Sequence, residues 1–320
     1  MESLVESVPN FSEGSRQDTL GEIETAIGSV GGAWLLDASA DADHGRSVFT
    51  VAGFPGRVMT ALEAAVAVAV ERIDLRLQHG QHPRIGAVDV IPFIPMGDTT
   101  MEQCIEGARR FAATVAERFG LPVYLYGQAT GAAGRTLADI RRPGFEGLDA
   151  AMQQPGNTPD FGPSRPHPTA GATAVGARRP LIAYNIQLAS TDVAVARRIA
   201  ARVRERDGGL PAVQALGLFL DSQGCAQVSM NVLDHERTPL WRVWETVAQE
   251  ARREGVSVLD SELIGLAPVG TLLQVADHIG LASGRPVADR VGEAAAWLRI
   301  RHFEPGMALE LRLAAIRGDS

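Results

Sequence analysis

The chain has 320 residues and a mass of 34.0 kDa, enough for about two domains, and its 45% apolar and 21% charged content excludes a disordered or fibrous protein. The net charge of −8 argues against a general nucleic-acid or anionic-membrane binder. All 30 cationic side chains are arginine, which excludes the chemistry of a Walker A lysine, a Schiff base or a pyridoxal-phosphate anchor.

The first half of the chain alternates strand and helix signals in the order of a split βαββαβ unit. The predicted strands are residues 4–8, 34–37, 47–52 and 88–94. The predicted helices run from Ser15 to about residue 30 and from about residue 55 to residue 73. A polar tip, residues 39–46, is expected to join the two middle strands. A further helix begins with a capping box from Thr99 to Glu102 and ends at Gly120, and a strand over 123–126 follows it.

The second half repeats this order. Its predicted strands are residues 181–186, 213–220, 225–233 and 256–263. Thr191 and Thr238 are expected to cap its two helices, the second with Pro239 at its first position. We therefore expect an α/β (α+β) fold of two tandem ferredoxin-like βαββαβ subdomains with added helices, residues 1–180 and 181–320. Two antiparallel sheets, each with helices on one face, would form their cores.

A segment of unusual composition lies between the two halves. Residues 153–171 contain eight Pro or Gly residues, too many for a regular helix or strand. Composition alone favours an interdomain linker. The alternative is an ordered binding strip, because long segments without regular structure inside compact chains are often functional.

The most concentrated group of polar side chains is His79, Gln81, His82 and Arg84, on a loop stiffened by Pro83. An imidazole is the side chain best suited to move a proton at neutral pH. His82 is therefore a candidate catalytic residue, and a pair of surface loop histidines is the alternative interpretation.

A second polar group occupies residues 37–46 and combines aspartates with His44. Together with His79 and His82 it could ligate a metal. No HExxH motif, EF-hand loop or cysteine pair supports such a site, so no metal is expected and a charged hairpin tip is the alternative. Cys104, on the apolar stripe of its helix, and Cys225 are expected to be structural.

Several strings, in order along the chain, resemble glutamate formimidoyltransferase, the transferase part of the formimidoyltransferase–cyclodeaminase family. They are VPNFSEG at 8–14, GQHPRIGAVD at 80–89, PVYLYG at 122–127, PDFGP at 159–163 and GAT at 171–173. The resemblance runs from Ser3 to about residue 270. It implies the same two-subdomain, ferredoxin-like architecture as the pattern of predicted elements.

The resemblance implies transfer of a formimidoyl group from N-formimidoyl-L-glutamate to N5 of tetrahydrofolate, in histidine degradation. The family's catalytic histidine falls on His82, as general acid and base. The folate-contacting strip falls on Pro163, Ser164, Arg165, Pro166, His167, Pro168, Thr169, Ala170, Gly171 and Ala172. Its extended backbone is expected to lie along the pterin with free N–H and C=O groups. Asn10, Arg46 and Arg84 are further expected substrate-binding residues, since both substrates are polyanions.

Tetrahydrofolate is thus expected as the co-substrate of a cytoplasmic homodimer with no metal, nucleic-acid or membrane partner. A separate cyclodeaminase is expected to take the product, because the chain ends where that domain would begin. Departures from the family pattern at Ser39 and Gly45 leave alternatives open. These are formyl transfer between 5-formyltetrahydrofolate and glutamate or another amine, a non-catalytic folate-binding module, and a metal-dependent hydrolase using His44, His79 and His82.

Overall fold

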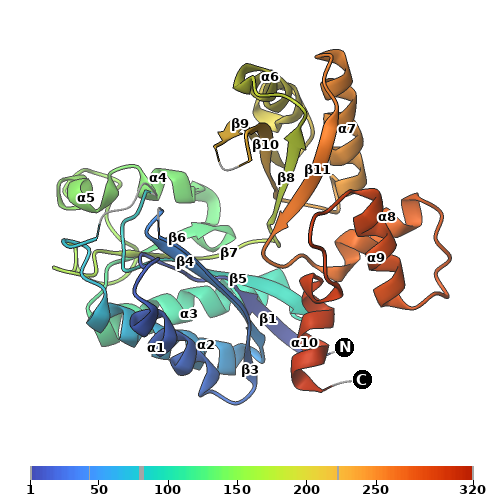
Figure 1. Ribbon diagram of the computed structural model, residues 1–320. Coiled ribbons are helices and arrows are strands. Elements are labelled where there is room, and N and C mark those ends of the chain that lie inside the picture. The colour runs from blue at the N-terminus through green and yellow to red at the C-terminus, as the bar shows by residue number, and fades with distance from the viewer. Residues whose placement is uncertain (1, 43, 79–82, 222, 319–320) are drawn as a thin grey trace. The chain divides into compact units, whose positions relative to one another are not determined.

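The computed structural model describes residues 2–42, 44–78, 83–221 and 223–318. The chain divides into two compact units, Met1–Arg179 and Pro180–Ser320, and each unit contains its own β-sheet and its own hydrophobic core (Figure 1). Strands and helices alternate through both units, which confirms the expected α/β class.

The central strands of the first unit follow the ferredoxin-like order. The short strands β1 (Ser3–Ser7) and β2 (Asn10–Phe11) occupy one position in the sheet, between β4 (Arg46–Gly53) and β5 (Val88–Gly97). β3 (Ala33–Asp41) pairs with β4 at the edge, and all these pairings are antiparallel. The two halves of the expected βαββαβ unit therefore lie in one sheet. The polar tip of the β3–β4 hairpin is shorter than expected, because Asp41 still pairs with Arg46.

Two further strands extend this sheet, so it is mixed and not purely antiparallel as expected. β7 (Thr173–Ala177) pairs in parallel with β5, and β6 (Val123–Gly127) pairs in parallel with β7. Parallel neighbours require long crossover connections, and α3 (Met101–Phe119) lies in the crossover from β5 to β6. The sequence analysis missed β7, because a buried strand of small residues carries no alternating pattern.

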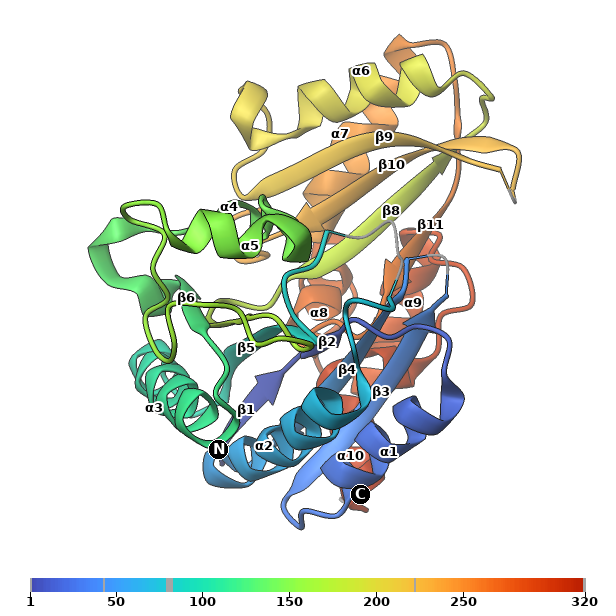
Figure 2. The same cartoon turned by 90° about the vertical axis from the view of Figure 1, so that its left-hand side faces the viewer.

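Helices cover both faces of this sheet, whereas one covered face was expected. α1 (Gln17–Gly28), α2 (Pro55–Arg72) and α3 pack on one face, and α4 (Leu137–Arg141) and α5 (Gly144–Met152) lie on the other (Figures 1 and 2). A short 3₁₀ helix, Gln128–Ala133, follows β6. The second helical layer belongs to the chain between β6 and β7, which is built into this unit.

The N-caps of α1 and α3 are each shifted by one residue from the expected positions, whereas α2 begins at Pro55 as expected. The N-cap of α3 is Thr100 and not Thr99: its side chain accepts a hydrogen bond from the Gln103 backbone N–H, and the Gln103 side chain completes a capping box. α1 begins after Arg16, because Ser15 hydrogen-bonds to the buried Glu13 carboxylate instead of capping the helix. At the other end of α3, Gly120 takes the expected left-handed conformation.

The second unit has a four-stranded antiparallel sheet in the order β11-β8-β10-β9, the ferredoxin-like order of a βαββαβ unit. Its strands are β8 (Ile182–Leu188), β9 (Val213–Leu220), β10 (Cys225–Val232) and β11 (Val258–Ile264). Its helices are α6 (Val193–Val203), α7 (Leu240–Arg253), α8 (Val269–His278), α9 (Val287–Trp297) and α10 (Leu309–Arg317), with 3₁₀ turns at Glu205–Asp207 and Pro305–Met307. Within the described ranges, no helix is long and apolar enough to cross a bilayer.

Neither threonine expected to cap a helix in this unit does so. The N-cap of α6 is Asp192, which accepts from the Ala194 backbone N–H at 2.8 Å, one residue after Thr191. Thr238 is buried, and its hydroxyl donates to the Pro211 carbonyl at 2.6 Å. A tertiary hydrogen bond thus takes the hydroxyl that the local pattern assigned to a cap.

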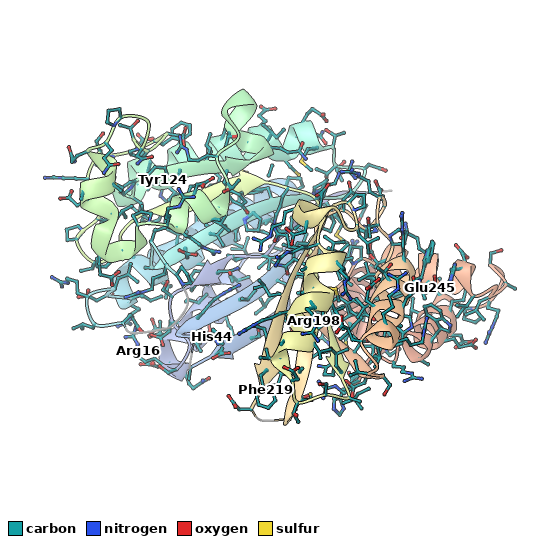
Figure 3. All side chains as sticks on the ribbon, turned by 90° about the horizontal axis from the view of Figure 1, so that it is seen from above. Arg16, His44, Tyr124, Arg198, Phe219 and Glu245 are labelled. Atoms are coloured by element: carbon teal, nitrogen blue, oxygen red, sulfur yellow. The ribbon has the colours of Figure 1, made fainter. Side chains whose placement is uncertain are left out.

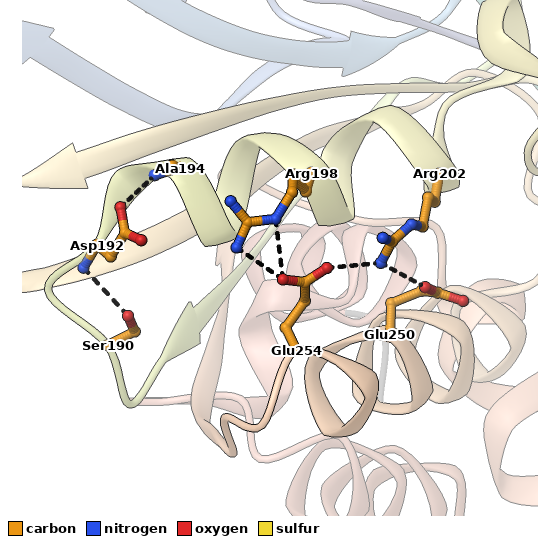
Figure 4. Close-up of polar contacts among 7 residues, drawn as sticks. All are labelled: Ser190, Asp192, Ala194, Arg198, Arg202, Glu250 and Glu254. Carbon is orange, nitrogen blue, oxygen red and sulfur yellow. Dashed lines mark hydrogen bonds and ion pairs between the residues drawn. The ribbon is translucent and has the colours of Figure 1, made fainter.

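An ion-pair network joins α6 to the end of α7 (Figure 4). Arg198 donates to Glu254 from two nitrogens, at 2.9 and 2.7 Å. Arg202, one turn further along α6, donates to both Glu254 and Glu250, at 2.8 and 3.2 Å. The two guanidinium groups therefore hold α6 against the end of α7.

Glu254→Gln is expected to lower the melting temperature, because a neutral amide pairs poorly with two guanidinium groups. The hydrogen bond from Arg198 outweighs burial and lowers the pKa of the Glu254 carboxyl below its ordinary value of 4.5. Its stabilising effect is therefore present above that value and is lost as the pH falls through the folded-state pKa. The difference in Tm between wild type and variant should shrink between neutral pH and about pH 3 in circular-dichroism melts.

The matched control is Glu304→Gln, an exposed glutamate of the same unit that lies outside the network. It should leave Tm nearly unchanged at every pH. An equal effect of the two substitutions would contradict a specific role for the α6–α7 network.

Candidate functional site

A small hollow, too narrow to admit a water molecule, lies in the first unit, against the ends of β2, β4 and β5. It is lined by Asn10, Phe11, Ser12, His44, Gly45, Arg46, Arg84 and Asp89. We call it the arginine pocket. Three of the residues expected from the sequence to bind substrate, Asn10, Arg46 and Arg84, thus surround one cavity although they lie far apart in the chain.

A buried carboxylate sets the charge of the arginine pocket. Asp89 is nearly inaccessible; its Oδ1 accepts from the Ile85 backbone N–H at 2.9 Å and its Oδ2 accepts from Arg141 Nε at 2.6 Å. Burial, reinforced by the neighbouring Arg141 cation, lowers the pKa of Arg46, while Asp89 and Asp41 act in the opposite direction. Asp89 therefore binds Arg141 directly and also stabilises the charge of Arg46.

Arg141 was missed by the sequence analysis. It lies on α4, more than fifty residues after Asp89, and nothing in its local sequence distinguishes it from the other arginines. Only the packing of α4 on the sheet brings it to the pocket wall. An arginine that pairs with a buried aspartate can be found only once the tertiary structure is known.

Arg84 is largely committed to the protein itself. Its Nη2 donates to the Gln78 carbonyl at 2.7 Å, to the Leu75 carbonyl at 3.4 Å and to the Glu146 carboxylate at 3.2 Å. Its side chain is 13% exposed, while that of Glu146 is 71% exposed. Arg84 thus lines the pocket, but it also holds together the chain on both sides of residues 79–82.

His44 lies in the turn between β3 and β4 and also lines the pocket (Figure 3). Its Nδ1 is 2.8 Å from Asp41 Oδ2, and its backbone N–H donates to Asp41 Oδ1 at 2.9 Å. Gly14 lets the chain before α1 pass close to this turn: a Cβ there would lie 2.0 Å from the Asp41 carbonyl oxygen. The His44 turn is therefore held in place by both a side-chain pair and a close backbone approach.

The expected catalytic residue His82, together with His79, lies outside the described residues. The metal alternative that combined these histidines with His44 also depends on them. Among the ranges that the structure does cover, no group of three or more His, Cys, Asp or Glu side chains is arranged to hold a metal ion.

The segment around residues 163–172 is folded into the first unit and is not a free linker. A tight turn closes it, in which His167 and Gly171 exchange two backbone hydrogen bonds of 2.8 and 3.0 Å. His167 Nδ1 accepts from the Ala170 backbone N–H at 3.1 Å, and burial lowers the pKa of this imidazole. The expectation of an extended backbone with free polar groups is wrong here, because the turn and its neighbours use those groups.

Exposure changes along this segment. Pro163, Ser164 and Arg165 are exposed, whereas Ala170, Gly171 and Ala172 are buried. Of the ten residues expected to contact folate, the first therefore face solvent and the last pack against protein. Between them Pro168 is exposed as well, and Pro166, His167 and Thr169 are half-buried.

The buried part pairs with the chain that follows residues 79–82. The Ala172 N–H donates to the Ile85 carbonyl at 2.9 Å, and the Ala87 N–H donates to the Ala170 carbonyl at 3.0 Å. Two glycines make this approach possible: a Cβ on Gly86 would lie 1.9 Å from the Ala172 carbonyl oxygen, and one on Gly171 would lie 2.1 Å from the Ile85 carbonyl oxygen. Residues 85–87 and 170–172 thus form one hydrogen-bonded structure.

Comparisons with known proteins cover both units. The sequence model described as "Formiminotransferase domain, N-terminal subdomain" matches residues 4–178, and that described as "Formiminotransferase domain" matches residues 183–285. The chain is 42% identical to a glutamate formimidoyltransferase of Streptococcus pyogenes over 87% of its own length and 93% of that protein. It is 43% identical to a glutamate formimidoyltransferase of Thermoplasma acidophilum, over 86% and 92% of the two chains. It is also 42% identical to a formimidoyltransferase-cyclodeaminase of Sus scrofa, of which it spans 52%.

Gly86→Ala and Gly171→Ala are expected to destabilise the protein by about 2 kcal/mol or more, because each added methyl group meets a backbone oxygen that cannot move aside. At Gly171 the positive φ of 66° adds backbone strain. Urea unfolding measures the change. The control, Gly21→Ala in α1, has no atom within 4 Å of the new Cβ and should stabilise the protein slightly. A wild-type unfolding midpoint for Gly86→Ala would contradict the close approach.

Proposed function

The chain belongs to the formiminotransferase family, and from this premise we propose how its own residues carry out the reaction. It is an enzyme that transfers a formimidoyl group from N-formimidoyl-L-glutamate to tetrahydrofolate. The observation that carries this conclusion is identity above 40% to two glutamate formimidoyltransferases, over more than nine-tenths of their length. It favours a catalyst over a non-catalytic folate-binding module.

The reaction needs one group that moves a proton twice. N5 of tetrahydrofolate attacks the formimidoyl carbon, and the tetrahedral intermediate must lose the N5 proton and return one to the departing glutamate nitrogen. We assign both transfers to His82, which takes the proton as a base and gives it back as an acid. The assignment of His82 is supported by its place in the sequence, between Gln78 and Arg84. The Arg84 side chain lines the arginine pocket and donates to the Gln78 carbonyl.

The arginine pocket supplies the charge that the substrates need. Both substrates carry several carboxylates, and the chain as a whole carries a charge of −8, so binding requires a local excess of cations. Arg46 is the candidate ligand, since it lines the pocket and is only half-buried. A guanidinium stays protonated even when buried and donates two parallel hydrogen bonds to a carboxylate. Asn10, at the same pocket, is the candidate polar contact.

For the folate-contacting strip we propose a division of labour. The exposed residues Pro163, Ser164 and Arg165 lie against the ligand, and the buried residues Ala170 to Ala172 fix the strip to the chain that follows His82. Tetrahydrofolate would thus be held as a co-substrate, without a metal. This assignment rests on the family resemblance together with the change of exposure along the segment.

We further propose that the enzyme is a cytoplasmic homodimer, and that a separate cyclodeaminase takes 5-formimidoyltetrahydrofolate from it. The relatives that it matches over nearly their whole length are named for the transferase alone. The animal relatives, of which it spans about half, carry both activities in their name.

His82→Ala is expected to lower kcat by roughly 10²- to 10⁴-fold, the usual contribution of a general acid and base, while tetrahydrofolate still binds. A steady-state assay of glutamate release measures kcat, and calorimetry measures folate binding. His302→Asn, an exposed histidine of the second unit, is the control and should keep full activity. Full activity of His82→Ala would remove this residue from the mechanism.

Arg46→Gln is expected to raise KM for one of the two substrates by roughly ten- to a hundredfold, as the loss of a charged hydrogen bond does, with a smaller effect on kcat. Initial rates with each substrate varied in turn give both KM values. Arg57→Gln, an exposed arginine on α2, should change neither. If Arg46→Gln also leaves both KM values unchanged, Arg46 is not the carboxylate ligand.

A further inference from the structure

We propose that Asp160 is a positioning residue, which fixes the chain before Pro163 to the edge strand β6 and thereby places residues 163–165 for tetrahydrofolate. The inference rests on the proposed function, in which these exposed residues lie against the ligand. It adds a residue outside the folate-contacting strip. It also gives a role to the PDFGP motif at residues 159–163, of which the proposed function uses only Pro163.

The Asp160 carboxylate is bound to β6 and to the chain just before α4. Its Oδ2 accepts a hydrogen bond from the Leu125 backbone N–H at 2.7 Å, and Arg135 Nη1 donates to the same oxygen at 3.1 Å. The Arg135 guanidinium also lies over the Tyr124 ring, 5.3 Å from its centroid. A carboxylate that accepts from both a backbone N–H and a guanidinium has a defined orientation. Asp160 therefore joins two parts of the first unit to the motif.

Backbone hydrogen bonds place the same segment along β6, an end strand of the sheet that pairs on its other side with β7. The Val123 carbonyl accepts from the N–H groups of Asp160 and Phe161, at 2.9 and 3.2 Å. The Val123 N–H donates to the Phe161 carbonyl at 2.9 Å, and the Tyr124 hydroxyl donates to the Asn157 carbonyl at 2.8 Å. The Asp160 side chain thus adds a bond to β6 that the backbone pairing does not supply.

Gly162 joins this anchored segment to the strip. It has a positive φ of 84°, and a Cβ there would lie 2.5 Å from the Leu121 carbonyl oxygen. The chain therefore passes directly against the backbone that leads into β6 before residues 163–165 reach solvent. Because Asp160 lies only three residues before Pro163, the position of the exposed residues depends on how the anchored segment is held.

The ion pair has little effect on the stability of the fold. The side chains of Arg135 and Asp160 are 29% and 30% exposed, and ion pairs with such access to water contribute little to the free energy of unfolding. Phe161 packs against the hydrophobic core and keeps the segment attached when the pair is removed. Loss of the carboxylate should therefore loosen the segment without unfolding the unit. A ligand must then order the loosened segment again, which weakens its binding.

The test compares two substitutions of Asp160. Asp160→Ala removes both bonds, and we expect Kd and KM for tetrahydrofolate to rise roughly three- to tenfold, the usual cost of ordering one or two side chains on binding. Tm, kcat and the KM for N-formimidoyl-L-glutamate should stay near their wild-type values. Asp160→Asn keeps an acceptor for the Leu125 N–H and should recover part of the lost affinity. Calorimetry gives Kd, and initial rates give kcat and both KM values.

Glu117→Gln is the matched control, since it removes a carboxylate at an exposed position of α3 in the same unit, and its Kd for tetrahydrofolate should be that of the wild type. Arg165→Ala tests the contact itself and should also weaken folate binding. A wild-type Kd in Asp160→Ala beside weakened binding in Arg165→Ala would overturn the positioning role. A large fall in Tm, or an equal rise in both KM values, would overturn it as well.

The remaining outcomes separate this inference from the function on which it rests. Wild-type folate binding in both Asp160→Ala and Arg165→Ala would show that the strip does not contact folate, and the positioning role would be wrong with it. Absence of formimidoyl transfer in the wild-type protein would overturn the proposed function. The calorimetric Kd would still test Asp160 in that case, because it does not depend on turnover.

Discussion

The site depends on close contact between backbones at glycine residues. Gly14 packs against the backbone of the turn that carries His44. Gly86 lies against the Ala172 carbonyl and Gly171 against the Ile85 carbonyl, and neither position has room for a Cβ atom. Because these contacts are between backbones, the segments can exchange main-chain hydrogen bonds, as Ile85 and Ala172 do. The β3–β4 turn, residues 85–87 and residues 170–172 are thus held at fixed separations.

The charged residues at the arginine pocket include one buried carboxylate and the arginines around it. Asp89 is buried, and its carboxylate accepts hydrogen bonds from Arg141 and from the Ile85 backbone N–H, so its negative charge is already compensated within the protein. Arg46 lines the same hollow and is the residue that we propose binds a substrate carboxylate. Arginine suits such a place because its guanidinium keeps its proton when burial would discharge a lysine. A protein with an excess of acidic residues can in this way bind polyanionic substrates.

The two units share one strand order but differ in the strands and helices added to it. The second unit keeps the simple ferredoxin-like sheet and adds helices after it, while the first adds two parallel strands and a second helical layer. The residues of the arginine pocket all come from the elaborated unit. The lining residues belong to the βαββαβ part of this unit, to β2, the β3–β4 turn and the chain at the start of β5, and none of them lies on its added strands or helices.

Local pattern was enough to predict the repeated βαββαβ order and the buried stripe of α3 with Cys104. These follow from periodicity, turn residues and ordered motifs, which are properties of neighbouring residues. The pairing of Arg141 with Asp89, the bond from Gln78 to Glu13 and the parallel strand β7 did not follow from it. Each joins segments that are far apart in the chain, and such contacts exist only when packing has decided which surfaces meet.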